Sequence, residues 1–414
     1  MRLLFLTPQL PHPSRQGTAI RNWGLIKSLS ARHRITLLTF AEPDAALSPE
    51  LRAACQRIEI VPPPRRAMAA RLWQLAASPL PDLAHRLASR AFAERLAALL
   101  QSETFDAVFC EGLELAPFLF TTENTEHAEK SNKDSAPSVF SVVRLFDAHN
   151  CETMLQSRAF ESDLRQPRRW PAALYSLIQS RRLARYEAQV CQSAHRVLCV
   201  SSEDAAGLRS LWPGVDPVIV PNGIFLDEYG PDFQLQNSKF KIQLVFTGKM
   251  DYRPNVDAAV WFAHEIFPAI RREAPEAEFV VVGQSPTEAV RQLARGPGVR
   301  VTGAVDDARP FIAGAAVYVA PLRMGGGTRF KLLEAMALRR AIVSTRLGAE
   351  GFGVTSGREL RLADTPEAFA RAVVALLHNE GQRAALGAAG YEFAKRYDWG
   401  KIVPRVEEVL SVEC

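Results

Sequence analysis

Residues 324–337 read MGGGTRFKLLEAMA, so three glycines run directly into two cations and a glutamate. The apolar run AVYVAPL at 316–322 precedes this stretch, which gives the order strand, glycine loop, helix. Glycines let the backbone approach a ligand closely, and the first amides of a helix lack partners within it. Those amides and the helix dipole favour an anion, most often a phosphate. The stretch therefore predicts a phosphate site; a glycine-rich turn with two solvated cations is the alternative.

Two cations and one acid follow the glycines. Arg329 and Lys331 fall in the first turn of the predicted helix, where cations oppose the dipole unless an anion lies between them. Lys331 and Glu334 are three residues apart and share a helix face. The other helix positions are apolar, so we expect Glu334 to reach a ligand and accept hydrogen bonds from a ribose diol. A surface ion pair between Lys331 and Glu334 is the alternative.

The stretch FTGKMDYRPN at 246–255 repeats this logic at another strand end. Gly248 is expected to turn the chain, Lys249 to supply a cation, and Asn255 to start the next helix. The Gly-x4-Gly-Lys-Ser/Thr pattern of an ATPase is absent, and neither half has a Gly-x-Gly-x-x-Gly motif after its first strand. Both ATPase and NAD-enzyme interpretations are therefore weak.

Short apolar runs separated by helical patterns recur along the whole chain, which indicates parallel sheets covered on both faces. In the first half the runs are RLLFLT (2–7), RITLLTF (35–41), DAVFC (106–110), VVRLFD (142–147) and RVLCV (196–200); in the second half they are IQLVFTG (242–248), AEFVVVG (277–283), VRVTG (299–303), AVYVAPL and AIVST (341–345). The pattern predicts two doubly wound, Rossmann-like α/β domains facing across a cleft. Ligands bind such sheets at the carboxyl ends of the strands.

The predicted boundaries follow changes in composition. Residues 1–219 form an N-terminal domain in which the polar segment 121–138 is a surface insertion. Residues 220–239, rich in Pro, Gly, Asn and acids, form a linker. Residues 240–395 form the second domain, and residues 396–414 form a C-terminal helix that packs back on the first domain.

Composition limits the class of protein. The chain has 414 residues and a formal charge of +5, which argues against a dedicated nucleic-acid binder. The basic residues concentrate in two arginine clusters with interleaved apolar residues, at 65–95 and 158–185. We expect these clusters to favour an anionic membrane surface; a solvated basic helix face is the alternative.

The six cysteines have neither CxxC nor zinc spacing. The N-terminus is apolar for only five residues before a proline, which is too short for a signal-peptide core, and no stretch approaches a membrane span. These features predict a cytoplasmic protein that touches the inner face of the membrane peripherally without crossing it.

The first half offers fewer candidates. FDAHNCET at 146–153 places His149 just past a buried strand, beside Asn150 and Glu152. A structural histidine is the equal alternative. The loop containing Gly17 and Thr18 suits an acceptor or the donor pyrophosphate. Neither an Asp-x-Asp pair nor a His/carboxylate cluster suggests a divalent metal, so no metal and no cofactor is expected and cations must neutralise the leaving group.

Together these motifs resemble a family 4 retaining glycosyltransferase with the GT-B fold. FTGKMDYRPNVDA, VPNGI, GGGTRFKLLEAMA and STRLGAEG resemble the subgroup found with bacterial exopolysaccharide biosynthesis, and the match is densest from about 242 to 352. The resemblance implies a UDP- or GDP-linked sugar donor held mainly by the second domain and a glycan or lipid-linked acceptor held mainly by the first. It also implies retention of anomeric configuration, with cations stabilising the departing diphosphate.

The resemblance implies roles for individual residues. Lys249 and Lys331 hold the diphosphate, Glu334 holds the ribose, and His149 lies near the transferred sugar; these two lysines and His149 are the implied catalytic set. The implied donor-binding set is Gly248, Arg253, Asn255, Gly283, Gly325, Gly326, Gly327, Thr328, Arg329 and Glu334. Many members carry Glu-x7-Glu, but here the first position is Gly326, so other groups must read the sugar. A nucleotide-sugar 2-epimerase and a two-domain solute-binding protein remain the alternatives.

Overall fold

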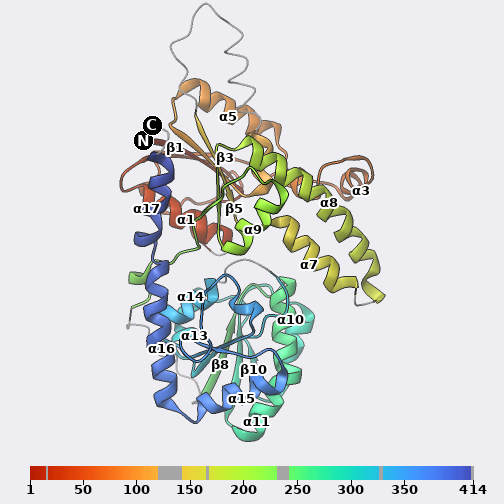
Figure 1. Cartoon of the computed structure of the whole chain (residues 1–414), viewed down its shortest axis with the longest axis vertical. Helices are drawn as coiled ribbons and strands as arrows, with labels where there is room; N and C mark the ends of the chain where they lie inside the picture. Colours follow the sequence, from red (N-terminus) through yellow and green to blue (C-terminus); the bar gives the residue numbers. More distant parts are fainter. Residues whose placement is uncertain (15–16, 120–141, 165–166, 231–241, 326–329, 412–414) are drawn as a thin grey trace, which may run out of the picture. The chain divides into compact units, whose positions relative to one another are not determined.

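The computed structural model describes residues 1–14, 17–119, 142–164, 167–230, 242–325 and 330–411. These residues form two compact units (Figure 1). The first comprises Met1–Pro221 with Val403–Cys414, and the second comprises Asn222–Ile402. The predicted insertion at 121–138 and the second part of the predicted linker, residues 231–239, lie outside the described residues.

The first unit contains a parallel sheet of seven strands in the order β3-β2-β1-β4-β5-β6-β7. Its strands are β1 (Arg2–Thr7), β2 (Arg34–Phe40), β3 (Arg57–Val61), β4 (Ala107–Glu111), β5 (Val143–Ala148), β6 (Arg196–Cys199) and β7 (Val218–Ile219). Its helices are α1 (Gly17–Leu29), α2 (Pro49–Ala54), α3 (Met68–Ala77), α4 (Asp82–Arg86), α5 (Arg90–Ser102), α7 (Glu152–Leu164), α8 (Trp170–Ser193) and α9 (Ser202–Leu211). The strand order reverses between β1 and β4, which is the crevice where doubly wound sheets bind ligands.

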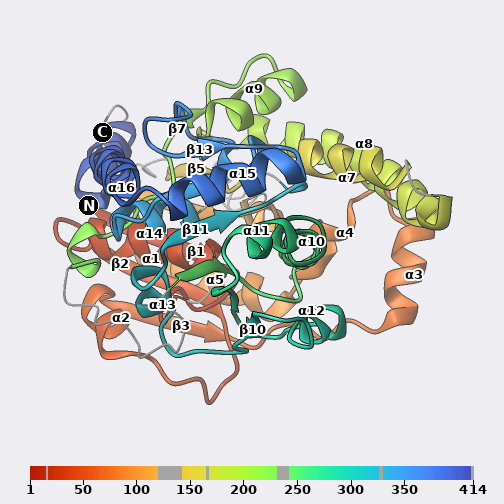
Figure 2. The ribbon, with the colours of Figure 1, turned by 90° about the horizontal axis from the view of Figure 1, so that it is seen from below.

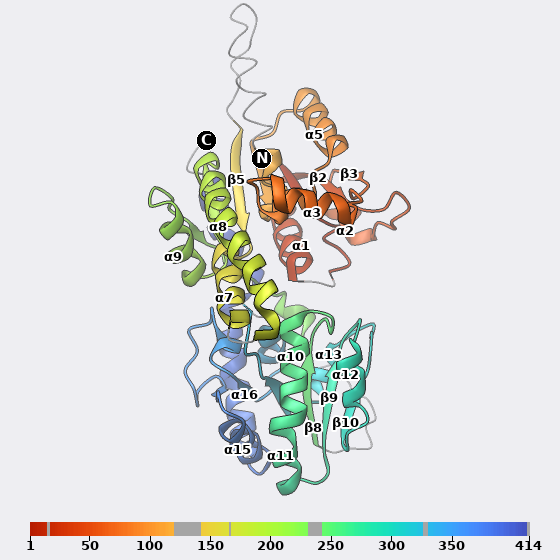
Figure 3. The same cartoon turned by 90° about the vertical axis from the view of Figure 1, so that its right-hand side faces the viewer.

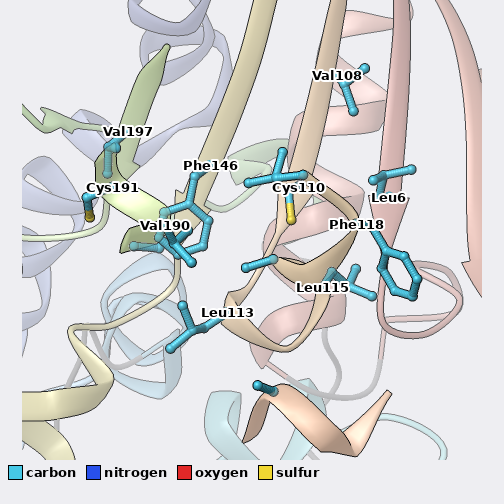
Figure 4. Close-up of a cluster of buried hydrophobic side chains, with 14 of the residues drawn as sticks. Leu6, Val108, Cys110, Leu113, Leu115, Phe118, Phe146, Val190, Cys191 and Val197 are labelled. Carbon is cyan, nitrogen blue, oxygen red and sulfur yellow. The ribbon is translucent and has the colours of Figure 1, made fainter. Parts of the chain in front are cut away.

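Alternating residues of these strands supply the core of the first unit. On one face, Leu6, Cys110 and Phe146 pack with Val190 of α8 and Phe118 (Figure 4). Phe5 and Phe109 directly precede Leu6 and Cys110 in their strands. Their rings stack, with centroids 4.4 Å apart. Helices α7 and α8 run side by side (Figure 3).

The second unit contains a six-stranded parallel sheet in the order β10-β9-β8-β11-β12-β13. Its strands are β8 (Ile242–Thr247), β9 (Ala277–Val282), β10 (Val299–Val301), β11 (Val317–Ala320), β12 (Ile342–Ser344) and β13 (Arg361–Leu362). Its helices are α10 (Arg253–Trp261), α11 (Phe267–Glu273), α12 (Glu288–Leu293), α13 (Arg309–Ala313), α14 (Phe330–Ala337), α15 (Pro366–Leu377), α16 (Glu380–Ala394) and α17 (Trp399–Ser411), the last continuing into the first unit. Here the strand order reverses between β8 and β11.

Both faces of the second sheet are covered, as the apolar runs predict. Phe246 and Phe279 pack with α10, α11 and α15 on one face. Val245 and Val280 pack with α13 and α14 on the other. The carboxyl ends of β8, β9 and β11 therefore lie together at one edge of a rigid core, where the predicted glycine loops begin.

Candidate nucleotide-sugar site

The two loops after β8 and β9 pass each other so closely that only glycine fits. A Cβ built on Gly283 would lie 1.7 Å from Gly248 O, and one built on Gly248 would lie 2.6 Å from Asn255 Nδ2. Gly248 N also donates to Val282 O (3.0 Å), which ties the two loops together. These glycines therefore bring backbone to the sheet edge where a ligand phosphate is predicted.

Gly283→Ala is expected to lower the free energy of unfolding by about 1–3 kcal/mol, because the added methyl group must push the backbone of Gly248 aside. The same displacement should weaken nucleotide binding. Thermal melting and nucleotide titration measure the two effects. Gly353→Ala is the matched control, since a Cβ there meets nothing within 4 Å; equal behaviour of the two variants would contradict the assigned role of Gly283.

The ammonium of Lys331 on α14 is held at the end of β8. It donates to Thr247 O and to Asn255 Oδ1, both at 2.8 Å. It also lies 4.4 Å from the ring centre of Phe246, within cation–π range. Both of these acceptor oxygens are neutral, and together they fix the ammonium at the end of β8. The arrangement suits the binding of an anion at this sheet edge.

Glu334, one turn along α14, has a different partner. Its Oε1 accepts a hydrogen bond from the Tyr229 hydroxyl (3.3 Å). The guanidinium of Arg309 lies 5.9 Å from the ring centre of Tyr229 and also pairs with Asp307 at 2.9 Å. Burial raises the pKa of Glu334 to about 6, against the opposing effects of the Tyr229 hydrogen bond and the charge of Lys331. At neutral pH Glu334 is thus a carboxylate able to accept from hydroxyl groups.

The other residues predicted to bind the donor differ in how firmly they are held. Lys249 is about 42% exposed and pairs with Asp251 at 3.4 Å. The expectation that Asn255 starts a helix is wrong: α10 begins at Arg253, and the Asn255 amide donates to Lys249 O (2.9 Å). The Asn255 side chain therefore holds both the Gly248 loop and the Lys331 ammonium in place. Gly325 has φ +102°, which favours glycine. Gly326, Gly327, Thr328 and Arg329 lie outside the described residues.

In the first unit, His149 joins a buried cluster at the ends of β4 and β5. His149 Nε2 lies 3.1 Å from Glu111 Oε2 and 3.7 Å from Asp147 Oδ2. Arg21 of α1 holds Asp147 with two hydrogen bonds, Nε to Oδ2 (2.6 Å) and Nη2 to Oδ1 (2.7 Å). Arg21, Glu111 and Asp147 are essentially inaccessible, whereas the His149 side chain is 14% exposed. His149 is thus the cluster's link to the surface of the unit.

The pKa values follow from burial and from these pairings. Burial and then the Asp147 charge raise the pKa of Glu111 to about 7. Burial also acts to raise the pKa of Asp147, but the charge and hydrogen bonds of Arg21 outweigh it and lower that pKa. Burial acts to lower the pKa of His149, but the hydrogen bond to Glu111 and the charge of Asp147 raise it. Asp147 is therefore the acid that its arginine partner keeps ionised, whereas the pKa values of Glu111 and His149 are both raised.

Glu111, Asp147 and His149 bring ligand atoms within 4.8 Å of one another, which is a possible metal-binding arrangement. Arg21, however, already occupies both oxygens of Asp147. A cation would have to displace a buried, bidentate ion pair, so these residues do not fit a resident metal. The expectation that no His/carboxylate cluster exists is wrong, because Glu111 and Asp147 are 36 residues apart in sequence yet directly paired across β4 and β5.

Gly17 and Thr18, predicted on the acceptor side, lie in the first turn of α1 close to this cluster. With its amide in the orientation that satisfies both groups, Asn22 donates to Thr18 O (3.1 Å) and to Glu111 Oε2 (2.8 Å). The first turn of α7 is already occupied: Glu187 accepts from the amides of Glu152 and Thr153, and Asp204 accepts from that of Cys151. That helix terminus therefore anchors the His149 turn and is not open to a phosphate.

Residues 241–379 match the protein family described as Glycosyl transferases group 1. This part of the chain is similar to the group 1 glycosyl transferases. The predicted resemblance is thereby confirmed for the part of the chain that holds Gly248, Gly283, Lys331 and Glu334. A relative over a longer stretch is the phosphatidyl-myo-inositol mannosyltransferase of Mycobacterium leprae, 31% identical over 205 residues. That match covers 48% of this chain and 54% of the relative, so the chain spans about half the length of that relative.

Solved structures confirm the predicted fold over the whole chain. The sucrose-phosphate synthase of Thermosynechococcus elongatus matches with a TM-score of 0.69 at 17% identity, covering 99% of this chain and 98% of that one. Anabaena HepE in complex with UDP and glucose matches with a TM-score of 0.67 at 14% identity, covering all of both chains. At these identities the likeness concerns the GT-B fold alone.

Proposed function

We propose that this protein is a retaining glycosyltransferase that transfers a sugar from a nucleotide-sugar donor, UDP- or GDP-linked, to a glycan or lipid-linked acceptor in cell-surface or exopolysaccharide synthesis. The observation that carries the proposal is the fixed Lys331 ammonium beside the Gly248 and Gly283 loops, with the Glu334 carboxylate one helical turn away. The cation suits a diphosphate and the carboxylate suits a ribose diol, so one ligand satisfies both.

The relatives support the same proposal. The M. leprae protein is named as a mannosyltransferase acting on phosphatidyl-myo-inositol, and the HepE structure holds UDP and glucose. Both are consistent with a nucleotide-linked hexose as donor, and the first supports a lipid-linked acceptor. Lys331 and Lys249 would stabilise the charge that develops on the leaving diphosphate.

Calorimetry with UDP-, GDP-, ADP- and dTDP-sugars, followed by transfer assays with the donor that binds, tests the proposal. A transferase needs an acceptor for turnover, whereas a nucleotide-sugar 2-epimerase converts the donor alone and a solute-binding protein releases it unchanged. Excess EDTA in the transfer assay tests metal independence. Donor turnover that ignores every glycan and lipid acceptor would favour the epimerase.

The first unit also carries features suited to the surface on which a lipid-linked acceptor lies. Helix α3 buries none of its residues, and Met68, Leu72 and Trp73 are each more than 60% exposed. The N-terminal part of α8 exposes Trp170 and Leu174 as well. Arg182 of α8 donates to Leu75 O (2.8 Å), which fixes α3 beside α8 (Figure 2). No helix in the described ranges is both long and apolar enough to cross a bilayer.

The two predicted arginine clusters lie in the segments of the chain that carry these apolar side chains. Arg66, Arg90 and Arg95 form ion pairs with neighbouring acids, which reduces their pull on an anionic surface. Within the described residues, the other exposed arginines of the two clusters are Arg65, Arg71, Arg86, Arg168, Arg181 and Arg185. Exposed tryptophans with adjacent arginines are typical of peripheral membrane binding, which we propose for this unit.

Leu72→Ser/Trp73→Ser is expected to weaken binding to anionic vesicles at least tenfold, because each apolar side chain buried in the interface contributes about 1.5–3 kcal/mol. Co-sedimentation with anionic and neutral vesicles measures the partition coefficient. Trp212→Ser removes an exposed tryptophan of the same unit, on α9's C-terminal side, and serves as the control. Equal partition of both variants and the unaltered protein would rule out α3 as the membrane contact.

A further inference from the structure

Glu111 is a fully buried member of the His149 cluster, and its two carboxyl oxygens have different contacts. Its Oε2 faces His149 Nε2 at 3.1 Å and accepts from the Asn22 amide at 2.8 Å. Its Oε1 is buried and has no hydrogen-bond partner within the described part of the chain. Burying an unpaired oxygen costs more free energy when it belongs to a charged carboxylate than when it belongs to a neutral carboxyl group.

We propose that Glu111 is a positioning residue for the transfer reaction: its Oε2 accepts a hydrogen bond from Nε2–H of neutral His149, which leaves Nδ1 as the unprotonated nitrogen that meets the substrate. The inference rests on the proposed function for the substrate that His149 meets. The pairing of Glu111 with His149 and the nitrogen that carries the imidazole proton are properties of the first unit that can be measured without any turnover.

The sheet register explains why Glu111 and His149 pair. Glu111 and Asp147 are direct partners across β4 and β5, so two buried acids face each other. Arg21 takes both oxygens of Asp147, which keeps Asp147 ionised. Glu111 then lies beside a negative charge, and His149 is the cation-forming group that contacts it. Burial and the Asp147 charge raise the pKa of Glu111, and the hydrogen bond to Glu111 raises that of His149 against the effect of burial.

The geometry also selects the nitrogen. Because Nε2 faces the two acids, it carries the proton when the imidazole is neutral, and Nδ1 is then an acceptor. Nδ1 lies toward Gly112, where a Cβ would come within 3.7 Å of it. Gly112 has φ +94°, which favours glycine, so no Cβ of residue 112 contacts this side of the ring. An Nδ1 acceptor suits a hydroxyl group of a sugar.

Any test must distinguish the effect of Glu111 on His149 from the effects of the other charged groups near this pair. Glu114, on the turn after β4, places its Oε2 within 3.0 Å of the same Gly112 Cβ position. Arg21 lies behind Asp147 on α1. Glu114→Gln therefore removes a negative charge from the same turn while the hydrogen bond between Glu111 and His149 stays in place, which makes it the matched control for Glu111→Gln.

Histidine ¹⁵N NMR of the full chain tests the proton directly, with the His149 signals assigned by their loss in His149→Asn. We expect an Nε2-protonated neutral tautomer and a raised pKa in the unaltered protein. Glu111→Gln should lower the His149 pKa by about one unit or more, since the carboxylate partner is gone, and Glu114→Gln should shift it much less. An unchanged His149 titration in Glu111→Gln overturns the proposal, whatever the activity of the protein.

Transfer kinetics then test the positioning role. Glu111→Gln should lower kcat about 10- to 100-fold and leave the dissociation constant of the nucleoside diphosphate unchanged, because that ligand is assigned to the second unit. In a His149→Asn background, Glu111→Gln should cost nothing further, since Glu111 acts through His149. A full additional loss in that background overturns the proposal. Absence of transfer with every donor contradicts the proposed function instead, and the NMR result still decides which nitrogen of His149 carries the proton.

Discussion

Lys331→Met is expected to raise the dissociation constant of the nucleoside diphosphate about 100- to 1,000-fold, because the bound phosphates would lose a fixed cation in a partly dry site. The methionine keeps an apolar chain over the Phe246 ring, so the loss reports the charge more than the packing. The nucleoside alone should bind nearly as before. Calorimetric titration of the nucleoside and its diphosphate measures both. Lys401→Met, at an exposed site in the same unit, controls for net charge.

Glu334→Gln provides the contrast that separates the two residues. A carboxylate bound to a ribose diol serves nucleoside and nucleotide alike, so the variant should weaken both by the same factor. In the unaltered protein, nucleoside affinity should also fall as the pH drops below about 6, where Glu334 gains a proton and loses acceptor capacity. If Lys331→Met weakens nucleoside and diphosphate equally, or Lys331→Glu/Glu334→Lys restores binding, the glycine loop is a structural turn.

The sequence predicts the fold well where strands are buried on both faces. RLLFLT at 2–7 coincides with β1, and IQLVFTG at 242–248 with β8 and its glycine. The missed strands are β3, whose residues are mostly half-buried at the sheet edge, and β7 and β13, which have two residues each. Partial burial and short length remove the continuous apolar run by which a parallel strand is recognised.

The candidate site divides in the same way. Glycine and lysine positions in the second unit could be predicted because each follows its own strand directly, and GGGTRFKLLE is continuous in sequence. The partners of those residues could not: Lys331 bonds to Asn255, 76 residues away, and Glu334 accepts from Tyr229, 105 residues away. The cluster of Glu111, Asp147 and Arg21 also could not be predicted from the sequence, because the register of β4 and β5 and the placement of α1 create it. Contacts made only by the tertiary fold have no local pattern.

Arg21→Met is expected to lower the stability of the first unit by about 3–5 kcal/mol at neutral pH, the largest change in stability among these predictions. Arg21 and Asp147 are both buried, at 1% and 0% exposure, so the variant leaves the Asp147 carboxylate in the core without its arginine counter-ion. Urea unfolding followed by circular dichroism measures the loss. Arg32→Met breaks an ion pair in which the arginine is 72% exposed, and should cost less than about 1 kcal/mol.

The pH dependence identifies the cause of that loss. In the unaltered protein Arg21 keeps the pKa of Asp147 below its usual value, so this pair contributes stability above the unfolded pKa that disappears as the pH falls through the folded one. In Arg21→Met, burial without the guanidinium raises that pKa, so the variant loses stability as the pH rises. The difference between the two proteins should therefore be small near pH 4 and grow toward pH 7. Arg21→Met/Asp147→Asn removes the stranded charge and should recover at least half of the loss at neutral pH. A gap that is the same at both pH values, with no recovery in the double variant, would mean that Arg21 matters through packing and its hydrogen bond to Val220 O, and not as the counter-ion of Asp147.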